Sequence, residues 1–378
     1  MSIKEILSFN NLNADADQVV KAEDYKLHLK DGTILTDTMS GLWCTPLGYS
    51  NNRIKDAMIS QLHKLPYGSN HSGNQNEITE NYANKLCEAT GMDRVYFTNS
   101  GSTAVETAIK ITGRNIAICS KHSYHGSTIL SDNASDQDIN KFWGIANPMT
   151  VYKFTDHKDL RNKLNGFSKI AFVIIEPIVA SGGVYEHRPE VFELLTTWQK
   201  NGGIVIFDET VTGFGKLGTM FAMEKYNFTP DILVLGKGIT NGYFPMGACL
   251  AKEHTIKKIK MFNHGFTFSG HPVGCSAAWA TLNEIENRKP IIPEFELRLE
   301  KVEHRQIGCM GAIGFESREQ LSTFIDKMRE RGYIIESYNK DDGSKNPSSA
   351  VYCLPYIMTR QDYELFIKNM QEVINDEN

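Results

Sequence analysis

Two residues that could do chemistry stand at the ends of apolar runs. Lys237 lies between Gly236 and Gly238 directly after one run, and Asp208 ends another. A lysine amine becomes nucleophilic when burial or a nearby positive charge lowers its pKa, and it then forms an imine with a carbonyl compound. A carboxylate at a buried strand end needs a partner, which could be an arginine, backbone amides or the protonated nitrogen of a heterocycle. The flanking glycines indicate room for a group bonded to the lysine.

Two further segments could hold the phosphate and the ring of a flat cofactor. Gly101 lets a backbone approach an anion, and Ser102 and Thr103 offer hydroxyls and amides at the expected start of a helix. The plainer interpretation of this segment is an N-cap. Tyr124 lies in a loop beside a glycine and could cover one face of a ring, or it could simply pack.

Each feature has an ordinary structural explanation, but together they match the requirements of one cofactor. A lysine that forms an imine, an aspartate that pairs with a pyridinium, a phosphate cup and a stacking tyrosine are what pyridoxal phosphate needs. The sequence therefore predicts an enzyme that binds pyridoxal 5′-phosphate.

Short β-rich runs alternate with helical stretches through the middle of the chain. The runs begin near residues 95, 115, 151, 170, 203, 231 and 248. Several are apolar on both faces, as strands covered by helices on both sides must be. This alternation predicts an α/β fold with a mainly parallel sheet flanked by helices, and it places the segments above at the carboxyl ends of strands.

The length of 378 residues favours a large domain with a smaller one. Residues 25–37 alternate apolar and polar positions around Asp31-Gly32, which is typical of a β-hairpin, and charged helical segments follow residue 285. We expect an N-terminal segment over 1–44 that joins a small α+β domain over 285–378. The large cofactor-binding domain would span 45–284.

Composition and charge disfavour several classes of function. The net charge of -5 argues against nucleic acid as a partner. No apolar run reaches the ~18 residues of a membrane helix, and the start lacks the apolar core of a signal peptide, so we expect a cytoplasmic protein. The 7 cysteines are scattered singly, without a CxxC pair or a Cys/His cluster at zinc spacing, and this predicts buried thiols and no metal site.

The chain resembles the class III (subgroup II) aminotransferases, which are pyridoxal-phosphate enzymes of fold type I. The resemblance runs from about Leu29 to the C-terminus. The motifs that carry it, in chain order, are SGLWCTPLGYSNNRI, TNSGSTAVETAIK, YHGST, IFDETVTGFGKLG, GKGITNGYFPMGA and HGFTFSGHPVGCSAA.

The resemblance implies a role for each residue of the site. Lys237 would carry the internal aldimine and move a proton, and Asp208 would pair with the pyridine nitrogen. The other implied cofactor contacts are Gly101, Ser102, Thr103, Tyr124, His125, Gly126 and Thr210. The resemblance also implies a homodimer in which Thr267 reaches the phosphate of the neighbouring subunit, and a substrate pocket lined by Trp43. An amino group would pass from an amine donor to a carbonyl acceptor in ping-pong steps.

The substrate end departs from the family pattern. Many relatives have an arginine that binds a substrate carboxylate at the position where this chain has Glu336, and Lys216 likewise stands where arginine is common. Glu336 favours a neutral or amine-bearing substrate end, as in a diamine or amino alcohol. Alternatively, Glu336 points into solvent and Lys216 or Lys340 supplies a positive charge in this substrate pocket.

The motifs are similar to two subfamilies. SGLWC, YHGST and NGYFPMGA resemble the ω-amine and β-alanine:pyruvate group, whereas YCLPYIMT resembles the diaminopelargonate-forming aminotransferase of biotin synthesis. Ser127 follows YHG where the biotin enzyme has aspartate, which favours the ω-group. We therefore expect transfer from a primary amine or ω-amino acid to a keto acid or aldehyde.

Other functions remain as alternatives. Diaminopelargonate formation, and a lyase or aminomutase on the same fold, would use the same lysine, aspartate and phosphate cup. A nucleotide-binding module is disfavoured because it leaves Lys237 and Asp208 unexplained and the chain has no GxxxxGKS or GxxxxGKT pattern.

Overall fold

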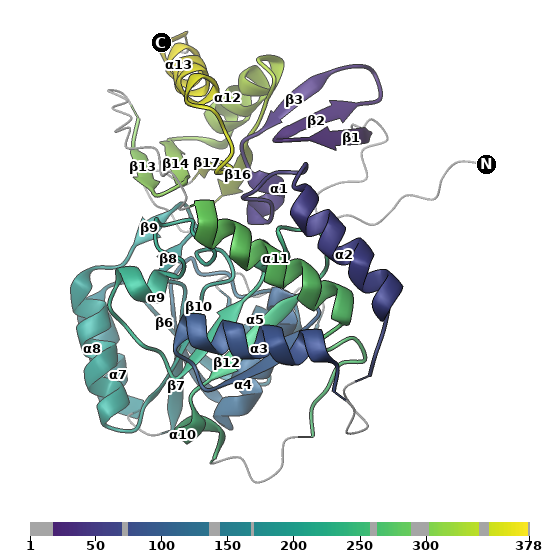
Figure 1. The fold of residues 1–378 in the computed structure, drawn as a ribbon. Helices are drawn as coiled ribbons and strands as arrows, with labels where there is room; N and C mark the ends of the chain where they lie inside the picture. The colour runs from purple at the N-terminus through teal and green to yellow at the C-terminus, as the bar shows by residue number, and fades with distance from the viewer. Residues whose placement is uncertain are drawn as a thin grey trace.

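The computed structural model describes residues 18–69, 75–135, 144–167, 170–257, 263–288, 302–339 and 348–376. Lys340, offered above as an alternative source of charge, lies outside the described residues. The described chain forms a large α/β body and, above it in Figure 1, smaller sheets and helices contributed by both ends of the chain.

A seven-stranded sheet forms the centre of the large body. Its strands, in spatial order, are β4 (Arg94–Thr98), β12 (Gly247–Ala251), β11 (Ile232–Leu235), β10 (Ile204–Asp208), β7 (Ala171–Ile175), β5 (Ile116–Ser120) and β6 (Thr150–Phe154). Only β12 runs antiparallel to its neighbours. The prediction of a mainly parallel sheet is confirmed, and the expected runs match its strands.

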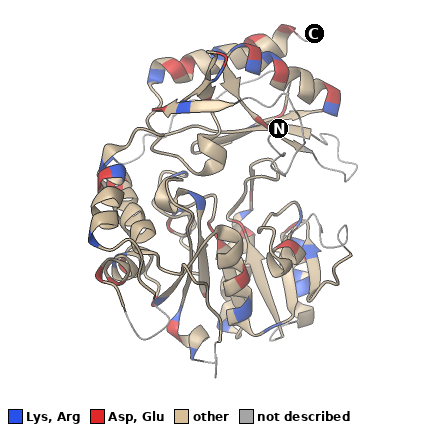
Figure 2. Cartoon of the chain, turned by 90° about the vertical axis from the view of Figure 1, so that its right-hand side faces the viewer, with Lys and Arg blue, Asp and Glu red and all other residues tan. Residues whose placement is uncertain are grey.

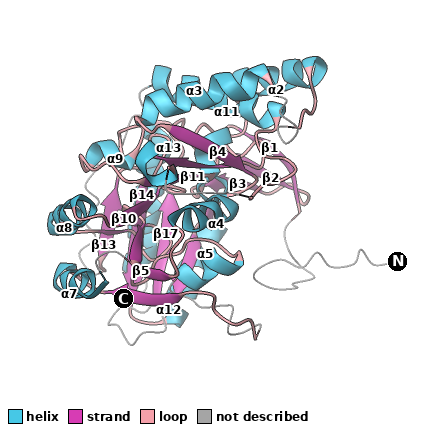
Figure 3. Cartoon of the chain, turned by 90° about the horizontal axis from the view of Figure 1, so that it is seen from below, coloured by secondary structure: helices cyan, strands magenta, loops and turns pink. Residues whose placement is uncertain are grey.

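Helices cover both faces of this sheet, because its strands are apolar on both faces. Alternate residues of one strand enter different cores: Phe207 packs with one cluster and Ile206 with the other. The first cluster includes residues of α2 (Asn52–Lys64), α3 (Glu77–Thr90), α7 (His157–Phe167), α8 (Pro189–Lys200) and α11 (Pro272–Arg288). The second includes residues of α4 (Gly101–Thr112) and α5 (Ile129–Ala134). Figure 3 shows α7 and α8 on one side of the strands and α4 and α5 on the other.

Both ends of the chain build the smaller body. The first of its sheets has the order β1 (Val19–Glu23), β2 (Lys26–Leu29), β3 (Ile34–Asp37) and β15 (Tyr333–Ile334). Strands β2 and β3 form the predicted hairpin, and β3 pairs in parallel with β15 near the other end of the chain. This pairing ties the N-terminal segment to the C-terminal one.

A second small sheet packs against the last helices. Its order is β13 (His304–Ile307), β14 (Met310–Phe315), β17 (Ser348–Cys353) and β16 (Glu336–Asn339), and the helices are α12 (Arg318–Glu330) and α13 (Arg360–Asp376). Figure 2 shows acidic and basic residues interspersed along these helices, at the top of the view.

Short elements complete the described chain. They are α1 (Ser40–Trp43), β8 (Ile178–Val179), β9 (Tyr185–Glu186), α9 (Ala222–Lys225), the 3-10 helix η1 (Lys237–Thr240) and α10 (Glu253–Ile256). No helix within the described ranges is both long and apolar enough to cross a membrane.

Candidate active site

The segments singled out in the sequence meet at one edge of the central sheet. Asp208 ends β10 and pairs with Val234 of β11, and Lys237 lies just beyond the end of β11. The loop that contains Tyr124 follows β5, and Gly101 opens α4 directly after β4. These strands run in the same direction, so their carboxyl ends share the edge where α/β sheets bind ligands.

Asp208 has its polar partners within the protein. Its side chain is 3% exposed, and its Oδ2 lies 2.8 Å from Nδ1 of His125. Its Oδ1 accepts hydrogen bonds from the backbone amide of Thr210, at 3.1 Å, and from the Thr210 hydroxyl. Nε2 of His125 is buried without a hydrogen-bond partner among the described residues. Asp208 is therefore a buried carboxylate held by an imidazole, and no arginine among the described residues bonds to it.

Gly101 and Gly236 are glycines because backbones meet there. A Cβ on Gly101 would lie 2.7 Å from Cγ2 of Thr210, and a Cβ on Gly236 would lie 3.1 Å from Cα of Gly101. A Cβ on Gly238 would lie 3.0 Å from Nζ of Lys216. These close contacts are with the protein itself, so the interpretation that the glycines around Lys237 make room for a group bonded to its amine stays a prediction.

The start of α4 fits a phosphate, although its hydroxyls have other partners. Ser100 is the N-cap: its Oγ accepts from the amide of Thr103, and Oγ1 of Thr103 accepts from the amide of Ser100. Oγ of Ser102 accepts a hydrogen bond from the amide of Ser127 at 3.2 Å. The N-cap interpretation thus applies to Ser100, and the amides of Gly101 and Ser102 at the positive end of the helix are the groups suited to an anion.

The loop after β5 is fixed to the same helix. Gly126 has a φ of 119°, and a Cβ on it would lie 2.4 Å from Oγ of Ser102. The Thr128 hydroxyl donates to Oε2 of Glu106 at 2.8 Å. Tyr124 is 38% exposed, and burial of its hydroxyl raises the pKa of this group, which keeps it protonated. The loop therefore presents an aromatic ring beside the start of α4.

Lys237 begins η1 in a left-handed conformation with a φ of 44°. This conformation costs a residue other than glycine roughly 1–2 kcal/mol, and such strain is concentrated at functional sites. Its amine makes no hydrogen bond within the described part of the chain, although its charge lies close enough to act on Glu176. A partly buried, unbound amine at this edge is suited to react.

Lys216 lies beneath this turn. Its side chain is fully buried, Nζ donates to the carbonyl of Gly213 at 3.2 Å, and burial lowers the pKa of the amine. The sequence placed Lys216 in the substrate pocket. The structure buries it under the Lys237 turn, and its place in the substrate pocket stays a prediction.

Trp43 belongs to a strained turn at the base of the smaller body. Ser40, Gly41, Leu42 and Trp43 all have positive φ values, from 47° to 70°. The carboxylate of Asp37 holds this turn by accepting from the amides of Met39 and Gly41 and from the Tyr49 hydroxyl. The Trp43 side chain is 3% exposed and packs in the core of the smaller body.

Glu336 opens the edge strand β16, where it pairs with Val351 of β17. The residue is exposed and forms no ion pair with any described residue. Burial of its carboxyl raises its pKa, and the negative charge of Asp37 adds to this shift. The carboxylates of Asp37 and Glu336 therefore lie near enough for the charge of one to act on the other.

Thr267 lies on the surface beside exposed aromatic rings. The residue is exposed, and its carbonyl accepts a hydrogen bond from the Tyr67 hydroxyl at 2.9 Å. Tyr67 is 41% exposed, Phe268 is 55% exposed, and their ring centroids are 6.0 Å apart. This surface is suited to contact another protein chain.

Two buried carboxylates were missed by the sequence reasoning. Glu176 follows β7 and Glu209 follows Asp208, and burial raises the pKa of each to about 7. Glu209 accepts from the amides of Ala222 and Met223 at the start of α9. An acidic residue directly after an apolar strand is the signal that identified Asp208, and it would also have found Glu176.

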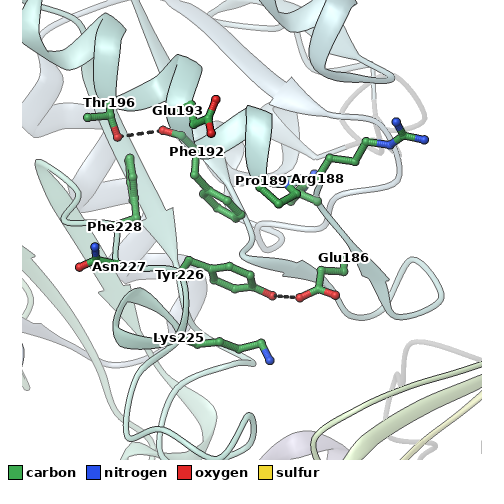
Figure 4. A pocket seen from close by; sticks show the side chains of 11 residues that line it. Glu186, Arg188, Pro189, Phe192, Glu193, Thr196, Lys225, Tyr226, Asn227 and Phe228 are labelled. Atoms are coloured by element: carbon green, nitrogen blue, oxygen red, sulfur yellow. Dashed lines mark hydrogen bonds between the residues drawn. The ribbon is translucent and has the colours of Figure 1, made fainter.

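A surface cavity of about 830 Å³ lies apart from these residues, between α8 and the segment after α9 (Figure 4). Phe192 and Tyr226 stack in it with centroids 4.5 Å apart, and the Tyr226 hydroxyl donates to Oε1 of Glu186 at 2.7 Å. None of the predicted site residues lines it. We therefore assign the chemistry to the sheet edge and not to this cavity.

The fold and the site define a class of enzyme. A mainly parallel sheet with a buried aspartate, a glycine-bounded helix start and a lysine at one edge is the arrangement that pyridoxal phosphate requires. Comparison with known proteins agrees: residues 11–374 match the family described as aminotransferase class-III.

The chain belongs to the class III aminotransferases. It is 34% identical over 286 residues to the acetylornithine aminotransferase of Clostridium acetobutylicum, covering 72% of each chain. It is 32% identical to gamma aminobutyrate transaminase 3 of Solanum lycopersicum, covering 74% of this chain and 63% of that one. The crystal structure of an omega-transferase from Vibrio fluvialis JS17 superposes with a TM-score of 0.84 at 25% identity, covering 96% of this chain and 98% of that one.

The family fixes the cofactor and the reaction class. The protein is an aminotransferase that depends on pyridoxal 5′-phosphate, it has the expected fold type I, and its substrates are small amine and keto compounds. The described residues fit this group: the glycine contacts shape a cradle at the start of α4, and Asp208 ends its strand beside it.

Proposed function

We propose that the chain transfers an amino group from a primary amine or ω-amino acid to a keto acid or aldehyde, in two ping-pong half-reactions. The observation that carries this proposal is the meeting of Lys237, Asp208, Tyr124 and the start of α4 at one sheet edge. Lys237 is the only residue among them with an amine that can link to the cofactor.

The side chains at this sheet edge have different proposed roles in the reaction. The bound cofactor supplies an electron-withdrawing ring that stabilises negative charge at the carbon next to the transferred nitrogen. Asp208, oriented by His125 and Thr210, would pair with the ring nitrogen and keep a proton there. Lys237 would take and return the proton at the substrate carbon, and the Tyr124 ring would exclude water from one face.

The ω-amine assignment is supported by the relatives. One relative is a gamma aminobutyrate transaminase, and gamma-aminobutyrate carries its amine at the end away from the carboxylate. A neighbouring solved structure is described as an omega-transferase. Both favour a donor whose reacting amine is not next to a carboxylate.

Among these donors, we propose that the protein prefers those whose distal end is neutral or positively charged. Asp37 and Glu336 bring two acidic groups to the smaller body, and the charge of Asp37 acts on the Glu336 carboxyl. An added carboxylate would be repelled there, while a second amine would be attracted. Initial rates with putrescine, β-alanine and 4-aminobutyrate test this, and a preference for the two amino acids would contradict it.

We also propose that the active unit is a homodimer, in which Thr267 completes the neighbouring site. Support comes from its exposure beside Tyr67 and Phe268. The proposed division into residues 1–44, 45–284 and 285–378 follows the pairing of β3 with β15, and in it the site lies mainly in the middle part. Sedimentation of wild type and Thr267→Ala, with cofactor affinity measured on the same samples, tests the shared site.

The half-reaction is the direct test of the proposed function. Holoenzyme mixed with an amine donor and no acceptor should form carbonyl product equal in amount to the active sites and then stop, because the nitrogen stays on the enzyme. A keto acid added afterwards should restart turnover. Continuous release of ammonia without an acceptor would identify a lyase instead.

A further inference from the structure

Glu176 is a buried carboxylate to which the proposed reaction gives no task. It follows the fully buried strand β7, is 3% exposed, and forms no ion pair within the described ranges. A carboxylate in such surroundings is costly unless hydrogen bonds and nearby charge compensate it.

Glu176 is held on two sides. Its Oε1 accepts a hydrogen bond from the amide of Tyr124 at 2.9 Å. Its backbone carbonyl lies 3.1 Å from Nε2 of His187, which must donate because a carbonyl only accepts. Burial lowers the pKa of His187 to about 4, so this imidazole is neutral and carries its proton on Nε2. His187 also lines the surface cavity described above, so it holds Glu176 from the side of that cavity.

The bond from Tyr124 to Glu176 fixes the Ser123–Tyr124 peptide, which directly precedes two site residues. Tyr124 supplies the exposed ring, and His125, the next residue, reaches Oδ2 of Asp208 at 2.8 Å. The amide of His125 is fixed separately, by donating to Oγ of Ser135 at 2.8 Å. Without the Glu176 carboxylate, the Tyr124 amide would lose its hydrogen-bond acceptor. The backbone that places the Tyr124 ring would then be held less firmly.

The charges around Glu176 belong to the same site. His125, Asp208 and Lys237 all act on its carboxyl: the first and last lower its pKa, and Asp208 raises it. Burial is the largest effect and raises the pKa to about 7. A change at Glu176 therefore reaches both the ring-stacking loop and the electrostatics of the lysine and the aspartate.

We propose that Glu176 is a positioning residue of the cofactor site, which uses its carboxylate to hold the Ser123–Tyr124 peptide and so to place the Tyr124 ring that follows it. This inference rests on the proposed roles of Lys237 and Asp208. It assigns to Glu176 an effect on cofactor affinity that acts through Tyr124, without contact with the substrate.

Three substitutions separate the hydrogen bond from the charge. Glu176→Gln keeps an oxygen that can accept from the Tyr124 amide and removes the charge. Glu176→Asp keeps the charge but is shorter by one carbon, so it cannot reach that amide. Glu176→Ala removes both, and Glu193→Ala, an exposed glutamate of α8, is the matched control.

The test is the dissociation constant of pyridoxal phosphate, measured by equilibrium dialysis on cofactor-free protein, together with a pH titration of the visible absorption of the bound form. We expect Glu176→Ala and Glu176→Asp to bind about 10-fold or more weakly, as for loss of a hydrogen bond to a charged group. Glu176→Gln should keep wild-type affinity, and its absorption should titrate at a shifted pH because one charge near Lys237 is gone.

The outcomes distinguish this inference from the proposed function. Failure of the wild type to bind the cofactor would overturn the proposed function. Wild-type binding with equal affinity in Glu176→Asp, or a loss in Glu176→Gln as large as in Glu176→Asp, would overturn the positioning role alone. If Glu176→Ala does not fold, the Asp and Gln pair still decides.

Discussion

The edge of the central sheet and the part of the smaller body around Glu336, where we propose that the substrate ends, are built in different ways. At the sheet edge, Asp208 is fixed by hydrogen bonds, and a Cβ on Gly101 would lie 2.7 Å from Cγ2 of Thr210. At the other end, Glu336 lies exposed on an edge strand with one acidic neighbour. The first region leaves almost no freedom of residue type, whereas the second leaves much, which is how one cofactor site can serve different substrates.

The largest effect should come from Lys237, on which this contrast depends. Lys237→Ala should lower the rate of amino transfer by about 10⁴-fold, since a positioned acid–base group contributes up to this factor. Lys200→Ala, an exposed lysine at the end of α8, is the control and should keep wild-type activity. Steady-state rates with a saturating donor check this, and a loss below 10-fold would remove Lys237 from the chemistry.

Gly236 tests how tightly the sheet edge is packed. Gly236→Ala should lower the free energy of unfolding by about 1–3 kcal/mol, because its Cβ would press on Cα of Gly101 and on Thr210. It should also weaken cofactor binding. Gly166→Ala in α7 is the matched control, since no atom lies within 4 Å of its added Cβ. Urea unfolding measures the stability of both variants. Equal stability of Gly236→Ala and Gly166→Ala would contradict the close contact.

Glu176 gives the sheet edge a pH dependence. Burial raises its pKa from 4.5 to about 7, so within this window the folded protein holds a proton that the unfolded chain has released. Folding therefore becomes less favourable as the pH rises through the window, by about 3 kcal/mol in total. Glu176→Gln has no titrating carboxyl at this position, so its folding free energy lacks this pH dependence.

The comparison uses cofactor-free wild type and Glu176→Gln unfolded in urea at pH 5 and at pH 8. We expect the wild type to lose about 3 kcal/mol relative to the variant between these values. Glu209 is present in both proteins, so its own shift cancels. If the difference in stability between wild type and Glu176→Gln is the same at both pH values, the carboxyl is not buried as described.

Among these substitutions, one at Glu336 should give the smallest effect. It should change the preference between amine donors and leave stability almost unchanged. Glu336→Arg should move the ratio of kcat/KM for 4-aminobutyrate over putrescine by about 10-fold toward the amino acid, as for one reversed charge pair. Its stability should stay within about 0.5 kcal/mol of the wild type, because the site is on the surface. Glu316→Arg, an exposed glutamate of the smaller body, is the control.

The same contrast explains what the sequence could predict. Charged residues directly after apolar strands identified Lys237 and Asp208, because few other arrangements place a charge there. The positions of the strands along the chain, the mainly parallel sheet and the N-terminal hairpin followed from residue patterns. These features depend on local sequence and on burial. Both can be predicted from the residue types and from the spacing of apolar residues.

Other features depend on contacts between distant segments. The burial of Lys216 beneath the Lys237 turn and the close contact of Gly236 with Gly101 appear only once the strands are assembled. The left-handed turn over 40–43 contains a single glycine, and it is held by Asp37 and by β17, far along the chain. The surroundings of Glu336 likewise require the pairing of β16 with β17.

The visible absorption of the purified protein with pyridoxal phosphate tests the central claim most directly. The account predicts an absorption band of lysine-bound cofactor in the wild type that an amine donor removes and a keto acid restores. Lys237→Ala should lack that band. A wild type that takes up no pyridoxal phosphate, or a Lys237→Ala variant with an unchanged band, would contradict it.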